Sequence, residues 1–287
     1  MQPRLVTVAA GVYVLPGSGG TVTPENGGRI ANVAFIVGPL GIVVVDTGSS
    51  YREGEEIIAA IRSISNRPIR LAILTHPGAE AIFGAAAFQA RGIPVLAHRR
   101  GAELMAARCD TCLRNLKAVL GDDAMASTRV VKPDRMIDGN VRLALIGRPL
   151  RLIASEWSSA PGTIAVFDER TSTLVAGSEV SIDRIPDVRD ADLNAWRDTL
   201  AQIEALKCRH LVPGYGPIGD CANVGAFAQY LIELERHVAA LMNEGVSLGE
   251  LRGRCGLPEF ASWDQYETLH PENANRTYLR LERSQFK

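Results

Sequence analysis

The sequence predicts an α/β protein in which two mixed β-sheets pack face to face and helices cover their outer sides, a four-layer αββα sandwich. Short strand segments alternate with helical segments in both halves of the 287-residue chain, as in layered α/β architectures. Hydrophobic residues make up 46% of the chain and charged residues 22%, so it can bury a large core. No repeat, linker or low-complexity tract divides the chain. We therefore expect a single domain over residues 1–287, with a C-terminal helical extension from about residue 222.

In the first half, apolar runs bounded by turn residues predict the strands. The β-branched run at 42–45 ends in a polar Asp-Thr-Gly turn, which suits a buried strand. Three isoleucines at helical spacing predict a helix over 52–64, and Gly121 ends a long helix over 102–120. The remaining expected elements are strands at 12–15, 34–37, 71–74 and 94–97 and an alanine-rich helix over 79–90.

The second half repeats this alternation of strands and helices. Apolar runs predict strands at 142–146, 151–154, 164–167, 173–176 and 210–212. The last of these runs into a Pro-Gly-Tyr-Gly-Pro turn, a second glycine-rich strand end. Helices are expected at 192–206, 222–243 and 272–282.

Charge and hydropathy exclude two classes of protein. The 31 Lys and Arg residues are balanced by 32 Asp and Glu, and the net charge of −1 argues against a nucleic-acid partner. The long uncharged stretch at 5–24 is broken by Pro16 and three glycines, so we expect no membrane insertion. Its first part is more typical of a first strand than of a signal peptide.

Five cysteines include one closely spaced pair. Cys109 and Cys112 have CxxC spacing on a predicted helix, so their side chains can lie on one face. No second CxxC follows, and a zinc site built from four cysteines is therefore not expected. The pair remains open to three interpretations: a structural thiol pair, a disulfide, or a redox centre.

Candidate functional residues follow the strands, because ligand sites in α/β proteins form at the carboxyl ends of strands. Five such segments are polar or rich in glycine. They are Asp46-Thr47-Gly48, Thr75-His76-Pro77-Gly78-Ala79-Glu80, Ser158-Ser159-Ala160-Pro161-Gly162, Ala176-Gly177-Ser178 and Pro213-Gly214-Tyr215-Gly216-Pro217.

The order and spacing of these segments resemble the metallo-β-lactamase superfamily over nearly the whole chain. The resemblance implies the four-layer fold and a two-metal hydrolytic site, supplied largely by a Thr-His-x-His-x-Asp-His turn. Here that turn keeps only its first histidine, His76. The other ligand positions hold Gly78, Glu80, Ala81, Ser158 or Ser159, Ser178 and Tyr215.

These replacements predict that no catalytic metal is bound. Catalytic zinc takes three protein ligands from histidine, cysteine, aspartate or glutamate. Serine and neutral tyrosine are poor zinc ligands, so His76 and Glu80 could hold a metal only weakly. We expect no cofactor, with zinc as the alternative. The resemblance gives Asp46 a role in supporting the loops of the site, which does not require a metal.

We therefore expect a non-hydrolytic pseudoenzyme that binds a small molecule or a protein partner at the former active-site cleft. The alternative is a divergent hydrolase with an altered or mononuclear metal site, and a third possibility is a redox protein that uses the CxxC pair. A serine hydrolase is disfavoured. Ser159 or Ser178 could attack with His76 as base, but no carboxylate is placed by sequence to orient that histidine, and no Gly-x-Ser-x-Gly motif occurs.

A narrower resemblance joins the CxxC segment, the stretch at 184–192 and the stretch at 270–276. These segments look like a branch of predicted metallohydrolases associated with quinoprotein dehydrogenases and periplasmic sulfur oxidation. The branch implies a periplasmic protein, if the chain is a trimmed mature form, and cytoplasmic residence is the alternative. In the periplasm cysteines can pair. Besides the CxxC pair, Cys208 and Cys221 flank a segment that folds back on itself in the family architecture, and Cys255 would stay free.

Overall fold

The computed structural model describes residues 4–285 and contains two mixed sheets. The first sheet has seven strands in chain order, antiparallel from β1 to β4 and parallel from β4 to β7. Its strands are β1 (Val6–Ala9), β2 (Val12–Leu15), β3 (Val33–Gly38), β4 (Gly41–Val45), β5 (Ile69–Ile73), β6 (Val95–His98) and β7 (Arg135–Ile137).

The second sheet has five strands in the order β12-β11-β10-β9-β8. All of its pairs are antiparallel except β11 and β12, which run parallel. Its strands are β8 (Val141–Leu143), β9 (Leu150–Trp157), β10 (Pro161–Asp168), β11 (Thr173–Ser181) and β12 (His210–Tyr215).

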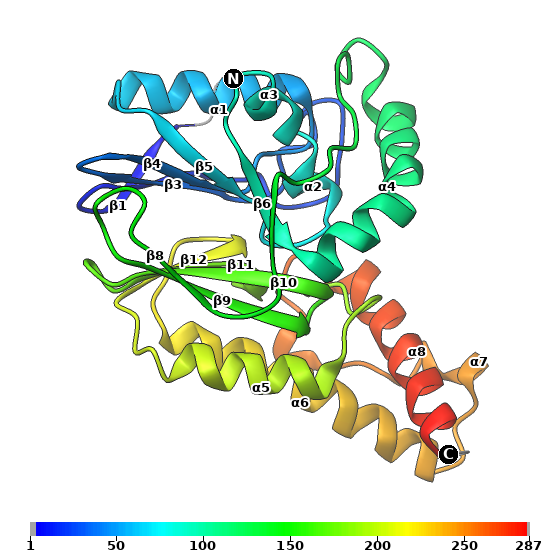
Figure 1. Ribbon diagram of the computed structural model, residues 1–287. Helices are drawn as coiled ribbons and strands as arrows, with labels where there is room; N and C mark the ends of the chain where they lie inside the picture. Colours follow the sequence, from blue (N-terminus) through cyan, green and yellow to red (C-terminus); the bar gives the residue numbers. More distant parts are fainter. Residues whose placement is uncertain (1–3, 286–287) are drawn as a thin grey trace.

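Helices cover the outer face of each sheet (Figure 1). The first sheet carries α1 (Tyr51–Ile64), α2 (Ala79–Ile82), α3 (Ala85–Gln89) and α4 (Arg99–Leu120). The second sheet carries α5 (Leu193–Glu204) and α6 (Ala222–Asn243), and α6 packs on α8 (Tyr266–Gln285) beside the short α7 (Leu248–Leu251) and a 3-10 turn at Pro258–Phe260. The predicted four-layer sandwich is confirmed.

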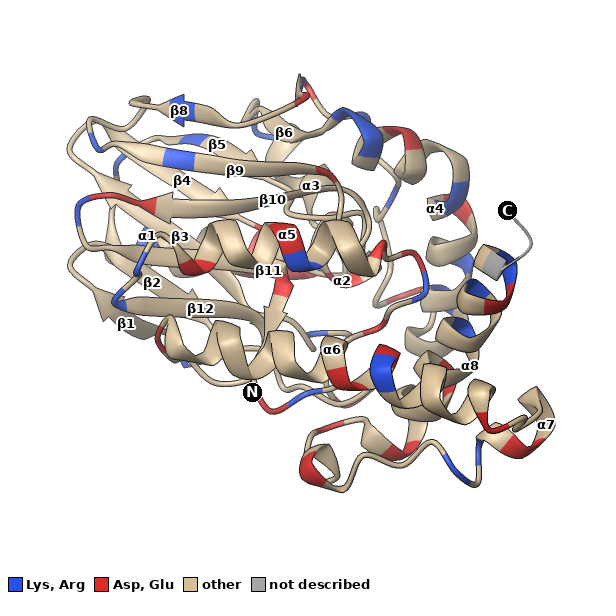
Figure 2. Ribbon diagram, turned by 90° about the horizontal axis from the view of Figure 1, so that it is seen from below, with Lys and Arg blue, Asp and Glu red and all other residues tan. Residues whose placement is uncertain are grey.

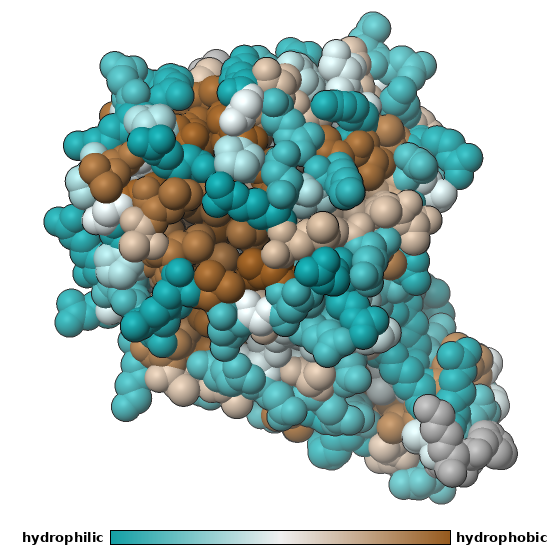
Figure 3. Space-filling view, viewed as in Figure 1, coloured by the Kyte–Doolittle hydropathy of each residue, from teal (hydrophilic) through white to brown (hydrophobic). Residues whose placement is uncertain are grey.

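The core has three apolar layers that correspond to this architecture. Ile36, Ile164 and Val212 belong to the layer between the two sheets. A second layer lies between the first sheet and helices α1 to α4. A third lies between the second sheet and helices α5, α6 and α8. On one side of the molecule apolar side chains are also gathered at the surface, beside the junction of the two sheets (Figure 3).

Several predicted boundaries were wrong, and the largest error concerns the helix expected over 79–90. It is divided into α2 and α3 at Gly84. A Cβ atom on Gly84 would lie 1.8 Å from the carbonyl oxygen of Thr47, so the backbone there packs directly against the loop after β4. The C-terminal helix begins at Tyr266 rather than at residue 272, and the short strands β1 and β7 had not been separately expected.

The C-terminal helices are fastened to the body of the protein by a buried polar network. The amide of Asn273 donates a hydrogen bond to the carbonyl of Pro186, and its oxygen accepts one from the N–H of Val188. Tyr230 contacts both Asn273 and His270. Since the side chains of Asn273, Tyr230 and His270 are buried, their hydrogen bonds hold α8 against the loop after β11.

Positively and negatively charged residues are interspersed along α4 and α8 (Figure 2). None of the helices in the described part of the chain is long and apolar enough to cross a membrane. The expectation that nucleic acid is not a partner stays a prediction.

Candidate functional site

A cleft of about 460 Å³ opens at the carboxyl ends of the central strands. Its lining includes most of the residues that were singled out from the sequence, namely His76, Gly78, Glu80, Ser159, Ser178 and Tyr215. Two others lie behind this surface, because Asp46 is 3% exposed and Ala81 is fully buried. The structure therefore brings the predicted site residues together around one cleft. They come from the loops after β4, β5 and β9, from α2, from within β11 and from the last residue of β12.

Asp46 orients the loop that carries His76. It directly follows β4 and has a positive φ of 64°, and one of its carboxylate oxygens accepts a hydrogen bond of 2.8 Å from the N–H of Thr75. Its other oxygen accepts one of 2.8 Å from the Thr75 hydroxyl, which also lies 2.8 Å from Nδ1 of His76. Because the hydroxyl has a single proton, which it donates to Asp46, Nδ1 of His76 must be the donor to Thr75.

Glu80 joins His76 to Tyr215 at the floor of the cleft. Nε2 of His76 lies 3.1 Å from Oε1 of Glu80, and the Tyr215 hydroxyl donates to the same oxygen. The Tyr215 loop is held in place by Asn32, whose amide donates to the carbonyls of Pro213 and Gly216. An ionised Glu80 that accepts from both neighbours satisfies this geometry.

The pKa shifts agree with an ion pair between His76 and Glu80. Burial favours the neutral carboxyl, but hydrogen bonds from His76 and Tyr215 and the charge of His76 outweigh it and lower the pKa of Glu80 to about 2. Burial opposes protonation of His76, yet the hydrogen bond and charge of Glu80, with Asp46 nearby, raise its pKa above the usual value. Burial and the adjacent Glu80 raise the pKa of Tyr215 well above its usual value, so its phenol stays a neutral donor.

Two glycines make room for this arrangement. A Cβ atom on Gly78 would lie 2.3 Å from Nε2 of His76 and 2.5 Å from Oε1 of Glu80, so the ion pair fills the space that a side chain at this position would need. Gly177, with a φ of 55°, sits against Thr75, where a Cβ atom would lie 2.4 Å from the hydroxyl oxygen. A side chain at either position would therefore clash with the hydrogen-bonded groups that link Asp46 to Tyr215.

The serines form a second polar group in the cleft. The hydroxyls of Ser159 and Ser178 lie 2.8 Å apart. Ser158 is fully buried and donates instead to the carboxyl of Glu179, whose pKa is raised by burial. Of the two serines left open by the sequence, Ser159 is thus the one that lines the cleft.

The residues present do not fit a catalytic zinc ion. Within residues 4–285, no three histidine, cysteine, aspartate or glutamate side chains converge closely enough to hold a metal. At the positions that hold the ligands in the family motif, only His76 and Glu80 are of a suitable type, and each is already engaged by the other. A histidine ligand must also be unprotonated, whereas Glu80 stabilises the protonated form of His76.

The sequence profile of the metallo-beta-lactamase superfamily matches residues 26–215 of this chain. The chain belongs to the metallo-β-lactamase superfamily. The fold comparison agrees. A metallo-beta-lactamase from Pontibacter korlensis superposes with a TM-score of 0.65 at 20% sequence identity, over 80% of this chain and 98% of that protein. A metallo-beta-lactamase from Hirschia baltica superposes with a TM-score of 0.64 at 18% sequence identity, over 79% of this chain and 97% of that protein.

A linear primary-alkylsulfatase from Pseudomonas sp. (strain ATCC 19151) is 23% identical over 267 residues, covering 78% of this chain. The match covers 49% of the alkylsulfatase, so this superfamily member spans about half the length of that relative.

Sequence reasoning assigned no role to two residues of the site in this superfamily member. Thr75 connects Asp46 to His76, and its place directly before the histidine was the available signal. Arg184 stacks over the ring of Tyr215 at 4.7 Å and pairs with Asp264. No sequence signal links Arg184 to this ring, because the contact depends on how the loop after β11 crosses the cleft.

The cysteines are divided between a disulfide and free thiols. Cys208 and Cys221 are bonded, with their Cα atoms 5.2 Å apart. Cys109, Cys112 and Cys255 are free, so the bond considered between Cys109 and Cys112 is not formed. Both residues lie in the continuous helix α4, whose regular backbone holds residues three apart at the short end of the disulfide range. Burial, with the neighbouring Cys112, raises the pKa of Cys109 to about 12.

Proposed function

We propose that this protein is a non-hydrolytic member of its superfamily that binds a small molecule or a protein partner in the cleft, without a metal cofactor. The observation that carries the proposal is the contact of His76 and Tyr215 with a single oxygen of Glu80. In this arrangement both ring nitrogens of His76 donate, one to Thr75 and one to Glu80, so a protonated histidine balances the carboxylate. A metal would have to displace that proton and compete with the tyrosine for the same oxygen.

The cleft has the composition of a ligand site. Its polar floor is formed by the ion pair and the two serine hydroxyls, and its walls include Leu104, Leu116, Ile185 and Trp196. A few converging polar groups within apolar walls are typical of sites that orient a ligand by hydrogen bonds and bind it by burial. This composition supports binding and does not require a nucleophile.

The second candidate function is a divergent metal-dependent hydrolase with an altered or mononuclear site. It is favoured by the metal-ligating chemistry of His76 and Glu80, which lie 3.1 Å apart in the cleft, and by the enzymes to which the chain is similar. A redox function of Cys109 and Cys112 is the weakest candidate, because a thiol with a pKa of about 12 is a poor source of the reactive thiolate.

We further propose that the protein works in the periplasm, with the cytoplasm as the alternative. The Cys208–Cys221 disulfide supports an oxidising compartment, since the cytosol keeps thiols reduced. The branch resemblance described above points the same way.

Hydrolysis assays test the proposal. Lactam, thioester, phosphodiester and alkyl sulfate substrates are offered to the purified protein with and without added zinc. We expect turnover near background in every case, because no metal lowers the pKa of a bound water. Turnover that is abolished in the variant His76→Ala, but kept in His210→Ala outside the cleft, would establish the hydrolase instead.

A further inference from the structure

The cleft has two walls that come from different parts of the chain. One wall is the face of α4 between Leu104 and Val119. The other is the segment 184–190 after β11, called the strap below. The strap residues in the lining are Arg184, Ile185, Pro186, Asp187, Arg189 and Asp190. α8 adds Leu269, so a helix outside the profile match at residues 26–215 also lines the cleft.

Two side chains of α8 hold the middle of the strap. The amide of Asn273 donates a hydrogen bond of 2.7 Å to the carbonyl of Pro186, and its oxygen accepts one of 3.2 Å from the N–H of Val188. The guanidinium of Arg276 donates one of 2.7 Å to the carboxylate of Asp187. These contacts fix both the backbone and a side chain of the strap.

A third side chain of α8 continues this row. Arg280 donates hydrogen bonds to the carbonyls of Val188 and Arg189. Asn273, Arg276 and Arg280 are spaced by three and four residues and therefore share one face of the helix. Backbone polar groups withdrawn from water need partners, and α8 provides them for the strap. The position of this wall therefore depends on α8.

The far end of the strap is joined to the opposite wall. Nη1 of Arg108 in α4 lies 2.7 Å from a carboxylate oxygen of Asp190, and the indole N–H of Trp157 donates to the Asp190 carbonyl at 2.7 Å. The Arg108 and Asp190 side chains are 56% and 32% exposed. An ion pair that is open to solvent contributes little stability, so this junction holds the strap less firmly than α8 does.

We propose that Asn273, Arg276 and Arg280 are positioning residues that fix the strap opposite α4, so that the cleft admits narrow small molecules and excludes bulky ones. The proposal rests on the proposed function, since it takes the cleft as the binding site, and of the two kinds of ligand it selects the small molecule over a protein partner. A bulky ligand could enter only when the strap moves away from α4. Such local opening becomes more frequent when the contacts that hold a segment are removed.

Cys112 reports on access to the cleft. It lines the cleft from α4, and its free thiol is partly exposed, whereas Cys109 and Cys255 are buried. The thiol is labelled in the full chain with N-methylmaleimide and with N-pyrenylmaleimide, which share one reaction and differ in size. Each rate is divided by the rate with glutathione, and peptide mass spectrometry identifies the labelled cysteine. In the wild type we expect the pyrenyl reagent to be the slower of the two.

The deciding variant is Arg276→Gln, which removes the ion pair with Asp187. We expect labelling by N-pyrenylmaleimide to become about fivefold faster, which corresponds to about 1 kcal/mol, and labelling by N-methylmaleimide to change less than about twofold. Arg276→Lys keeps the charge and should stay near the wild type.

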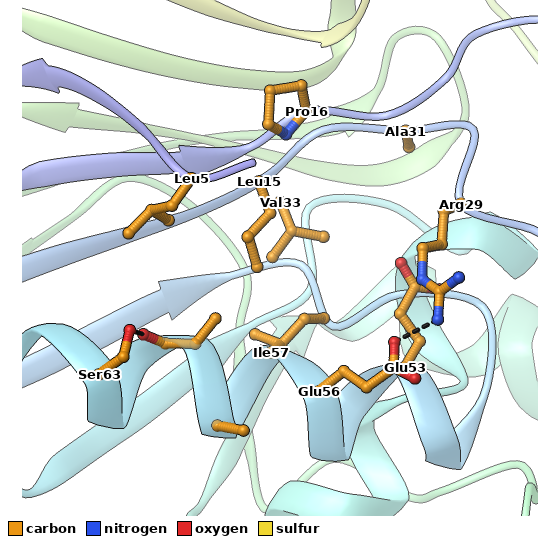
Figure 4. Close-up of a pocket in the computed structure, with 12 residues that line it drawn as sticks. Leu5, Leu15, Pro16, Arg29, Ala31, Val33, Glu53, Glu56, Ile57 and Ser63 are labelled. Carbon is orange, nitrogen blue, oxygen red and sulfur yellow. Dashed lines mark hydrogen bonds and ion pairs between the residues drawn. The ribbon is translucent and has the colours of Figure 1, made fainter. Parts of the chain in front are cut away.

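The control Arg29→Gln removes an ion pair with similar exposure. Arg29 and Glu56 are 26% and 31% exposed, against 26% and 35% for Arg276 and Asp187. Figure 4 shows Arg29 and Glu56 beside α1, in a cavity that shares no lining residue with the cleft. We expect Arg29→Gln to change neither rate.

Three outcomes would overturn the proposal. They are equal relative rates of the two reagents in the wild type, an unchanged pyrenyl rate in Arg276→Gln, or an equal acceleration of both reagents in that variant. Asp187→Asn removes the same ion pair from the side of the strap and should give the same result, so the test does not depend on the folding of one variant. Labelling involves neither ligand nor turnover, so failure here is distinct from failure of the proposed function, which the hydrolysis assays detect.

Discussion

Replacing Glu80 by glutamine removes the negative charge at the floor of the cleft and keeps the shape of the side chain. His76 is 9% exposed and Glu80 is 17% exposed, so the pair is largely withdrawn from water. Removing one partner of a buried ion pair costs about 3–5 kcal/mol. Glutamine can still accept the hydrogen bond from Tyr215, and we therefore expect the lower end, a loss of about 3 kcal/mol in the free energy of unfolding.

The effect should depend on pH in a defined direction. The pKa of His76 is raised in the folded protein, so its stabilisation is complete below the unfolded pKa of about 6.5 and is lost as the pH rises through the folded value. The pKa of Glu80 is lowered to about 2, so its contribution is present above about 4.5 and is lost as the pH falls through about 2. The difference between wild type and Glu80→Gln should therefore narrow when the pH is raised from 6 to 9.

Urea unfolding at both pH values measures this difference. Glu244→Gln is the matched control, because Glu244 is 56% exposed and pairs with Arg254 at the surface. We expect the control to change stability by less than about 1 kcal/mol. A loss below about 0.5 kcal/mol for Glu80→Gln at pH 6 would refute the ion pair, and so would a loss that does not vary with pH.

Three further predictions concern other parts of the chain. Burial raises the pKa of Glu53 to about 7, so its ionisation lowers the stability of the folded protein. As the pH rises from 4.5 to 8, the free energy of unfolding of Glu53→Gln should therefore increase by about 3 kcal/mol relative to wild type. A difference in urea unfolding that stays constant over this pH range would contradict this. Gly78→Ala should lower the free energy of unfolding by about 1–3 kcal/mol, because the added methyl group would displace the ion pair. The control Gly249→Ala, where no atom lies within 4 Å of the added methyl group, should not have this effect. Equal melting temperatures of the two variants would contradict the steric clash at Gly78. Thiol counting in denaturant without reductant should give three thiols, since Cys208 and Cys221 are bonded, and five would disprove that bond.

The sequence predicted the elements whose cause is local. The β-branched run of β4 predicted a buried strand, and the Asp-Thr-Gly turn that follows it identified Asp46 as a candidate site residue. Both predictions depend only on residues that are neighbours in the sequence. The long helix α6 was predicted with its observed bounds for the same reason. The position of the cleft followed from the rule that polar loops meet at strand ends.

Features that depend on distant contacts were not predictable. The break at Gly84 arises from the carbonyl of Thr47, and the link between Glu80 and Tyr215 joins residues 135 positions apart. The burial of Glu53 in α1 could not be predicted either, because a glutamate in the first turn of a helix is usually exposed to solvent. Such contacts are set by tertiary packing, which a single sequence does not display.

The central claim is that an ion pair between His76 and Glu80, and not a metal, organises the cleft. Its most direct test is elemental analysis of the purified protein after incubation with excess zinc and removal of unbound metal. We predict no stoichiometric zinc, because no three ligand-type side chains converge in the described part of the chain and because Glu80 raises the pKa of His76, which favours its protonated form. One or two zinc ions per chain that resist mild chelation would contradict the claim.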